Sequence, residues 1–199
     1  MSTIQISGSS LSANFSIELT GSKSETNRLL LLAALYPNLT LLNDSNAHDV
    51  SVMKKALKLS TGTVDIHHAG TAMRFLTAYF SVSENAEVVL TGSDRMKQRP
   101  IALLVDALRA LGATIEYRGE EGYPPLLIKG AVLSYSSVSI AANVSSQYLS
   151  ALCLVGAKLP EGLEIELVGS ITSLPYLNMT LQLLERIGIS AKLNDGRIH

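Results

Sequence analysis

The sequence predicts an α/β domain built from three copies of one unit. Three times, a small or polar loop leads into a mainly apolar helix, and these loops begin at Gly21, Ala69 and Val144. Each apolar helix is followed by a strand, an amphipathic helix and a further strand. A helix without a polar face must be buried, so we expect the three apolar helices to pack on one another at the centre. Their N-terminal loops then emerge on one face of the domain.

The first unit begins at a capped helix. Ser22 and Glu25 have the spacing of a capping box, which predicts a helix start just before Lys23. The apolar run 29–35 continues this helix. The unit is expected to go on with a strand at 39–42, an amphipathic helix at 49–59 capped by Asp49, and a strand at 63–66.

The second unit has the clearest amphipathic helix. Its apolar helix is expected at 73–80 and its strands at 86–90 and 114–118. Between those strands, Pro100 suits the first turn of a helix and Gly112 its C-terminal end. The apolar residues of that helix fall on one stripe: Ile101, Leu104, Val105, Leu108 and Leu111.

The third unit repeats the pattern after a longer interval. Residues 119–142 predict extra strands around a turn at 123–125. An apolar helix at 148–157 and a strand at 163–167 follow. The second helix starts at Pro175 and ends at Gly188, and a strand is expected at 190–193.

Both ends of the chain lie outside the repeats. Residues 3–6 and 14–19 predict two short strands around a turn at 8–10. Residues 194–199 have the pattern of a hairpin whose return strand is absent, so we expect the natural protein to be longer.

The composition is that of a globular protein with a full core. The 199 residues are 47% hydrophobic and 17% charged, with a net charge of −1 and no basic run, which argues against a nucleic-acid partner. The N-terminus has no secretory or organelle-targeting pattern and no apolar run reaches membrane-spanning length, so we expect a cytoplasmic protein. The single cysteine, Cys153, lies in an apolar run and is expected to be a buried, reduced thiol.

Cations accompany the first two loops. A helix start carries unpaired N–H groups and about half a positive charge, and so attracts anions. Lys23 and Arg28 follow the first loop, and Arg74 follows the second. Taken alone, each is equally compatible with a capped helix whose cations are solvated. The repetition of the design on one face favours an anion-binding site.

Two further segments support this interpretation. Arg95, Lys97 and Arg99 lie close together between a strand and a helix, which suggests a clamp for phosphate or carboxylate. Residues 145–147, Ser-Ser-Gln, place hydroxyls and an amide at the third helix start. The alternatives are an exposed basic turn and an ordinary N-cap.

Other chemistries are disfavoured. Adjacent His67 and His68 point to opposite sides of a strand end and lack further ligands, so we expect no metal and no other cofactor. Ser24 is not part of a recognisable triad, and the glycines do not form a nucleotide-binding P-loop.

Five segments, in order, carry a family resemblance: 22–28 (SKSETNR), 69–74 (AGTAMR), 95–101 (RMKQRPI), 145–149 (SSQYL) and 173–176 (SLPY). Together they resemble the 5-enolpyruvylshikimate-3-phosphate synthase family, but only its first half. The resemblance implies an enolpyruvyl transferase-like fold of two similar domains, each with three βαβαββ repeats around buried central helices. Residues 20–199 correspond to the first domain, truncated at its C-terminal end, and residues 1–19 to strands of an absent second domain.

The resemblance also implies an activity. Members join shikimate 3-phosphate and phosphoenolpyruvate to give 5-enolpyruvylshikimate 3-phosphate and phosphate, a step of chorismate and aromatic amino-acid biosynthesis. The implied partners are these two small molecules and the second domain. Because that domain supplies the acid/base carboxylates, we assign no catalytic residue here and expect this chain to be inactive alone.

The same resemblance assigns binding residues, position by position. The contacts implied for shikimate 3-phosphate are Lys23, Ser24, Arg28, Ser145, Ser146, Gln147, Ser173 and Tyr176. Those implied for phosphoenolpyruvate are Lys23, Gly70, Arg95 and Gln147, with Arg74 in a supporting role. The chain departs from the family pattern at His68, Phe75 and Leu174, where Asn, Pro and Lys are usual, which we expect to affect phosphoenolpyruvate or inhibitor binding.

Two other functions stay open. UDP-N-acetylglucosamine enolpyruvyl transferase shares the architecture, but it has a Lys-Asn pair in the first loop and a catalytic cysteine on a mobile loop. Here Ser24 follows Lys23, and Cys153 lies in a helix. The other alternative is a non-catalytic anion-binding module.

Overall fold

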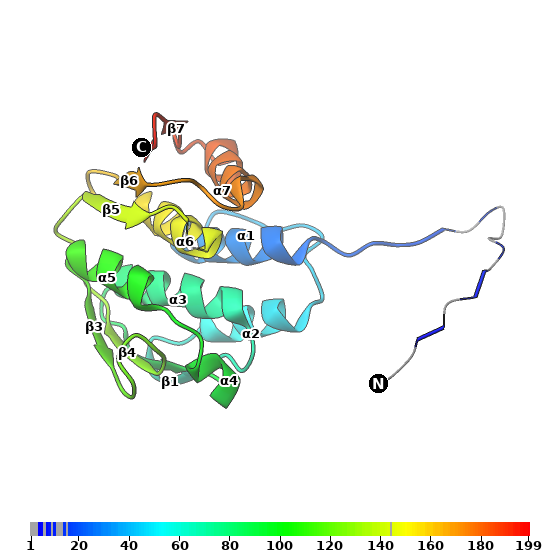
Figure 1. Cartoon of the computed structure of the whole chain (residues 1–199), viewed down its shortest axis with the longest axis horizontal. Helices are drawn as coiled ribbons and strands as arrows, with labels where there is room; N and C mark the ends of the chain where they lie inside the picture. The colour runs from blue at the N-terminus through cyan, green and yellow to red at the C-terminus, as the bar shows by residue number, and fades with distance from the viewer. Residues whose placement is uncertain (1–3, 6, 9, 11–13, 15, 144) are drawn as a thin grey trace.

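Two four-stranded sheets lie on either side of a layer of helices (Figure 1). The computed structural model describes residues 4–5, 7–8, 10, 14, 16–143 and 145–199. The predicted α/β class, with buried central helices, is confirmed.

The lower sheet in Figure 1 combines the strands of the second unit with the strand that was expected at 63–66 as the end of the first unit. Its strands lie in the order β1-β2-β4-β3, with β1 parallel to β2 and the other pairs antiparallel. The elements follow in sequence as β1 (Thr61–Asp65), α3 (Gly70–Val82), β2 (Glu87–Thr91), α4 (Asp94–Lys97), α5 (Ala102–Ala110), β3 (Thr114–Tyr117) and β4 (Leu126–Lys129). Apart from the short helix α4, this is a βαβαββ unit.

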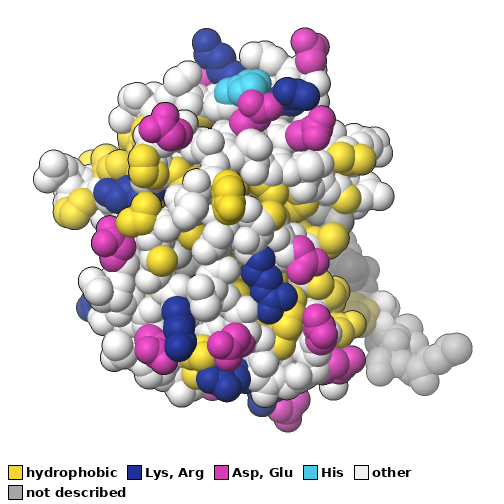
Figure 2. Space-filling model, turned by 90° about the vertical axis from the view of Figure 1, so that its left-hand side faces the viewer, with side chains coloured by type: hydrophobic (Ala, Val, Ile, Leu, Met, Phe, Trp, Pro, Cys, Tyr) yellow, Lys and Arg dark blue, Asp and Glu magenta, His cyan; other side chains and the backbone are white. Residues whose placement is uncertain are grey.

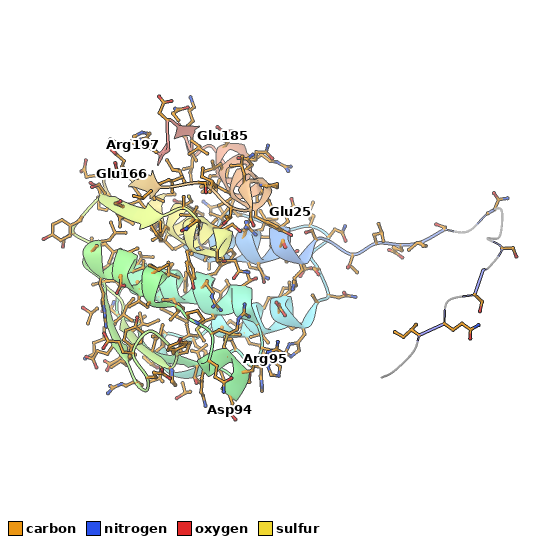
Figure 3. All side chains as sticks on the ribbon, viewed as in Figure 1. Glu25, Asp94, Arg95, Glu166, Glu185 and Arg197 are labelled. Atoms are coloured by element: carbon orange, nitrogen blue, oxygen red, sulfur yellow. The ribbon has the colours of Figure 1, made fainter. Side chains whose placement is uncertain are left out.

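The upper sheet repeats this topology, in the order β5-β6-β8-β7. Its elements are β5 (Ser137–Ala141), α6 (Ser146–Gly156), β6 (Glu164–Val168), α7 (Leu174–Arg186), β7 (Leu193–Asn194) and β8 (Arg197–Ile198). Arg197 on β8 forms ion pairs with two residues of β6, Glu164 at 2.8 Å and Glu166 at 3.5 Å. Figure 3 shows Arg197 and Glu166 side by side. The extra strands expected within 119–142 are β4 of the lower sheet and β5 of the upper sheet.

The first unit contributes α1 (Lys23–Leu35) and α2 (His48–Ala56). Ser22 caps α1 as predicted, because its hydroxyl accepts a hydrogen bond from the Glu25 N–H. The predicted strand at 39–42 is wrong: these residues are irregular, and Leu42 is 86% exposed. Among the described residues, neither sheet pairs with this segment. The predicted cap Asp49 is also wrong, since α2 begins one residue earlier and Asp49 lies in its first turn.

The centre of the molecule is formed by α1, α3 and α6, which pack on one another. Every residue of α6 except Gln147 is buried, and α3 buries its large side chains Phe75 and Phe80 completely. Leu31 and Leu32 of α1 complete this interior. The three helices run in the same direction, so their N-terminal ends lie on the right in Figure 1.

The structure also corrects two boundaries and two predictions about which strands are present. Pro100 precedes α5 rather than starting it, because the N-cap is Ile101. The strand expected at 190–193 is the shorter β7, and its return strand, β8, is present in the chain. At the N-terminal end, the described residues 4–5, 14 and 16–19 are not in strands, because they have no sheet to pair with, and the rest of that prediction lies outside the described residues.

Within the part of the chain that the structure describes, no helix is long and apolar enough to cross a membrane.

Candidate functional site

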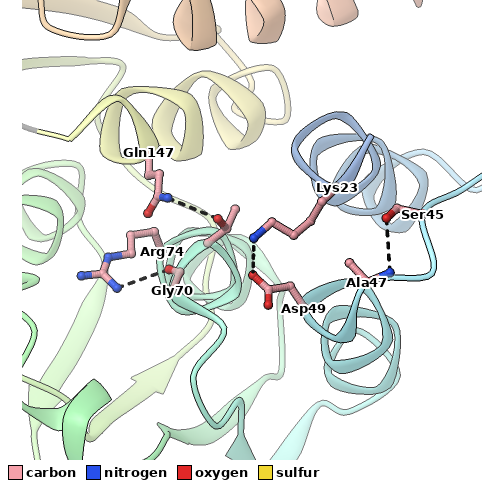
Figure 4. Close-up of polar contacts among 8 residues, drawn as sticks. Lys23, Ser45, Ala47, Asp49, Gly70, Arg74 and Gln147 are labelled. Carbon is pink, nitrogen blue, oxygen red and sulfur yellow. Dashed lines mark hydrogen bonds and ion pairs between the residues drawn. The ribbon is translucent and has the colours of Figure 1, made fainter. Parts of the chain in front are cut away.

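The loops of the three units meet at the N-terminal ends of the central helices (Figure 4). Gln147, in the first turn of α6, donates a hydrogen bond to the Thr71 hydroxyl at the start of α3, at 3.2 Å. Lys23, the first residue of α1, forms an ion pair of 3.2 Å with Asp49 in the first turn of α2. Figure 4 shows these helix starts, from all three units, on one face, as predicted.

Backbone packing holds the first two helix starts together. A Cβ atom on Gly21 would lie 2.1 Å from the Asn43 carbonyl oxygen, so only glycine allows the loop before α1 to lie against the loop before α2. Two hydrogen bonds fix the loop before α2. The Ser45 N–H donates to the Thr26 hydroxyl at 3.1 Å, and the Ala47 N–H donates to the Ser45 hydroxyl at 3.2 Å. These contacts bring Asp49 within reach of Lys23.

Arg28 is placed behind the first loop rather than on the surface. Its side chain is 2% exposed and packs on the Phe75 ring at 5.4 Å. The guanidinium donates to the Ser24 carbonyl at 2.8 Å and to the Tyr176 carbonyl at 3.2 Å. It also donates to the hydroxyls of Ser150 at 3.0 Å and Thr180 at 2.7 Å. Burial lowers the pKa of Arg28 to about 10.

This network ties three helices together. Arg28 lies on α1, Ser150 on α6, and both Tyr176 and Thr180 on α7. Since a buried charge without partners is costly, these hydrogen bonds fix the guanidinium and the three helices that surround it. Arg28 therefore sets how the loops before α1 and α7 lie relative to each other.

Arg74 has the corresponding position in the second unit. Its side chain is 4% exposed, and it donates to the Gly70 carbonyl at 3.3 Å and to the Pro100 carbonyl at 3.0 Å. Burial lowers the pKa of Arg74, and the neighbouring charge of Arg99 lowers it further. Arg74 thus connects α3 to the segment that precedes α5.

Arg95 is exposed, on the short helix α4. Figure 3 shows Arg95 on the side of the molecule where α3 begins. Together with His68, Met96 and Arg99 it lines an open pocket of about 550 Å³. The His68 ring is held by the Ser93 hydroxyl, 2.7 Å from its Nδ1 atom. The basic segment is therefore helical, which the sequence did not predict, and Lys97 pairs with Asp94 at its outer side, at 3.3 Å.

The serines of the third unit lie at two helix starts. Ser145 caps α6 by accepting the Gln147 N–H at 3.3 Å, and Ser146 follows it, 8% exposed. Ser173 precedes α7 in the left-handed conformation, with φ of 57°, and its hydroxyl has no hydrogen bond to any described residue. Such a backbone is unfavourable for serine and is often found where a side chain is aimed at a ligand. Tyr176, one turn on, is 47% exposed.

The distribution of charged side chains differs on the opposite face of the molecule, at the C-terminal ends of the central helices. Figure 2 shows the face at the C-terminal ends of the central helices, where basic and acidic side chains are interspersed with apolar ones. On the face with the helix starts, Arg95 and Arg99 share a pocket whose lining holds no carboxylate among the described residues. Arg95 and Arg99 thus add positive charge near helix starts, whose dipoles already favour an anion.

Three residues in this region were missed by the sequence reasoning. Asp49 was interpreted as a cap, and its pairing with Lys23 depends on a loop conformation that no local pattern encodes. Thr71, beside Gly70, was part of a recognised segment but received no role. Thr180 has no sequence signal other than its place on the inner side of α7.

The cysteine and the histidines have other surroundings. Cys153 is free and buried, as predicted, and burial raises its pKa to about 12, so the thiol is not a nucleophile. It lines an apolar cavity of about 220 Å³ between α6 and α7, away from the helix starts. His67 faces His48, with ring centroids 6.4 Å apart, whereas His68 faces Ser93.

Comparison with known proteins decides the family. The sequence model described as EPSP synthase (3-phosphoshikimate 1-carboxyvinyltransferase) matches residues 43–198. The chain belongs to the EPSP synthase family. A 3-phosphoshikimate 1-carboxyvinyltransferase of Bacteroides fragilis is 49% identical over 176 residues, which are 88% of this chain and 43% of the relative. One of Actinobacillus pleuropneumoniae is 41% identical over 206 residues, covering 88% of this chain and 48% of the relative.

The fold agrees with this assignment. EPSP synthase from Acinetobacter baumannii superimposes with a TM-score of 0.74 at 19% identity, over 92% of this chain and 46% of that structure. The chain thus has the fold of EPSP synthases and spans about half the length of the curated relatives it matches.

Proposed function

We propose that this chain is the shikimate 3-phosphate-binding half of a 3-phosphoshikimate 1-carboxyvinyltransferase. The observation that carries the proposal is the meeting of helix starts from three units: Gln147–Thr71 joins the third unit to the second, and Arg28 joins the first unit to the third through Ser150 and Tyr176. Aligned helix N-termini bind anionic groups, and both substrates of the reaction are polyanions. Family membership supports this choice over a different anion-binding function.

The proposed roles follow the positions of the side chains. Lys23, half-exposed on α1, binds the phosphate and reaches phosphoenolpyruvate. Ser173 and Tyr176 bind shikimate 3-phosphate from the start of α7. The other proposed contacts with shikimate 3-phosphate are Ser24, Arg28, Ser145, Ser146 and Gln147. Arg28 acts in large part by positioning, because its guanidinium already bonds to Ser24 and Tyr176.

Phosphoenolpyruvate is proposed to bind next to the start of α3. Gly70 allows a close approach to the helix N–H groups, Arg95 supplies a guanidinium from α4, and Gln147 lies between the two substrates. Arg74 supports this region from behind.

The chemistry requires more than this half. The shikimate 5-hydroxyl adds to C2 of phosphoenolpyruvate, and phosphate then leaves. A proton must be delivered to the enolpyruvyl carbon and removed again, which needs an acid/base pair. We assign these groups to a second domain and expect this chain to bind but not to turn over. A cytoplasmic location stays a prediction from the sequence.

Titration calorimetry tests the proposal. The chain is titrated with shikimate 3-phosphate, beside Lys23→Ala and, as a control, Lys58→Ala, an exposed lysine after α2. We expect binding that weakens about 10- to 100-fold in Lys23→Ala and is unchanged in Lys58→Ala, since a charge-assisted contact is lost only in the first. Heat on titration with UDP-N-acetylglucosamine, and none with shikimate 3-phosphate, would contradict it.

A further inference from the structure

Arg99 combines a fixed backbone with an unpaired side chain. Its N–H donates to the Met96 carbonyl at 3.0 Å. The carbonyl of the next residue, Pro100, accepts hydrogen bonds from Arg74 at 3.0 Å and from the Tyr148 hydroxyl at 2.7 Å. The Arg99 guanidinium itself forms no hydrogen bond or ion pair with any residue that the structure describes. The segment is anchored on both sides of Arg99, yet the charged group is left available.

The guanidinium lies against the first residue of α3. A Cβ atom on Gly70 would be 2.3 Å from Arg99 Nη1 and 3.1 Å from its Cζ. The group therefore occupies space that only a glycine leaves open, next to the helix N–H groups that lack partners within the helix.

Arg99 also lines two pockets whose described linings carry no negative charge. One contains His68, Arg95 and Met96, and the other, of about 370 Å³, contains Arg74, Ser145 and Gln147. Among the described residues, neither lining includes a carboxylate. The charge of Arg99 acts on Arg74 and lowers its pKa, in addition to the effect of burial. Arg95 and Arg99 thus bring two guanidinium groups to one pocket, and Arg99 reaches from it to the start of α3, an arrangement that favours an anion there.

We propose that Arg99 is a further substrate-binding residue, which binds the phosphoenolpyruvate anion at Gly70 together with Arg95. This rests on the proposed function, because that function supplies phosphoenolpyruvate as the ligand. The planar guanidinium offers two parallel hydrogen bonds to a carboxylate or phosphoryl group, and its fixed backbone limits where that group can lie.

The test is calorimetric titration of the chain with phosphoenolpyruvate, alone and with saturating shikimate 3-phosphate. Arg99→Gln removes the charge, Arg99→Lys keeps the charge but not the fork, and Arg118→Gln is the matched control, an exposed arginine at the end of β3. We expect phosphoenolpyruvate affinity to fall about 10- to 100-fold in Arg99→Gln, by less in Arg99→Lys, and not in Arg118→Gln. Shikimate 3-phosphate affinity and the thermal midpoint of Arg99→Gln should stay at wild-type values.

Several outcomes would overturn the proposal. One is wild-type phosphoenolpyruvate affinity in Arg99→Gln; another is a chain that binds shikimate 3-phosphate but no phosphoenolpyruvate. A chain that does not bind shikimate 3-phosphate would contradict the proposed function instead. If such a chain bound phosphoenolpyruvate and lost that binding in Arg99→Gln, the result would still support the anion site at Gly70.

Discussion

Lys23 and Asp49, from the first turns of α1 and α2, form an ion pair of 3.2 Å at the surface of the candidate site. The lysine side chain is 49% exposed and the aspartate 24%. A carboxylate beside the principal cation of a phosphate site competes with the ligand for that cation.

Asp49→Asn tests this competition. We expect shikimate 3-phosphate to bind about two- to fivefold more tightly to the variant at low ionic strength, because a partly exposed ion pair is worth up to about 1 kcal/mol. The gain should shrink in high salt, where charges are screened. Titration calorimetry at two salt concentrations measures both effects. Weaker binding to Asp49→Asn would show that the aspartate orients Lys23 rather than competing for it.

Thr180→Val tests the network around Arg28. The substitution keeps the shape of the side chain but removes the hydroxyl that accepts from Arg28 at 2.7 Å. We expect a loss of about 1–3 kcal/mol in the free energy of unfolding, because a buried charged donor loses its partner. Thr77→Val is the matched control: this threonine is also fully buried on a helix, but its hydroxyl bonds only to the Met73 carbonyl of its own helix. Equal losses in urea unfolding of the two variants would contradict the structural role of the network.

Cys153 predicts a pH dependence of stability. Burial raises the pKa of its thiol from 9.0 to about 12, so the folded chain keeps a proton that the unfolded chain releases. Stability from this group is therefore complete below pH 9 and is lost as the pH rises towards 12. Between pH 8 and pH 10 the loss is on the order of 1 kcal/mol. Urea unfolding of the wild type and of Cys153→Ala across this range should show the steeper decline in the wild type, and parallel curves would contradict the assignment.

Gly70→Ala tests the contact between Gly70 and Arg99. The new methyl group would displace the Arg99 guanidinium, whose Nη1 lies 2.3 Å from its position. We expect weaker phosphoenolpyruvate binding with little change in unfolding free energy, since the side chain of Arg99 is free to move and alanine suits a helix. In an Arg99→Gln background the same substitution should have a much smaller effect on affinity. Additive losses in affinity in the double variant would mean that the methyl group acts on the ligand directly.

Periodicity and capping predicted much of the fold. The apolar stripe from Ile101 to Leu111 is buried as expected, and the Ser22–Glu25 spacing located the start of α1. The failures occurred where structure depends on distant partners. Residues 39–42 have the apolar character of a strand but join neither sheet of the described residues, and β8 depends on pairing with β6 more than on its own short sequence.

The candidate site was only partly predictable for the same reason. Ordered motifs identified Lys23, Gly70, Arg95 and Gln147, which the structure brings to one face. The burial of Arg28 could not be derived from its own helix, because its hydroxyl partners come from α6 and α7, more than a hundred residues away in the chain. Arg99 was noted only as part of a basic segment, and its place against Gly70 emerges from the tertiary structure.

The most direct test of the account is a crystal structure of this chain with shikimate 3-phosphate. We predict the phosphate at the joined helix starts, within hydrogen-bond distance of Lys23 and of the serines before α6 and α7. A well-ordered ligand bound elsewhere, such as in the apolar cavity between α6 and α7, would contradict the central claim that these helix starts form the substrate site.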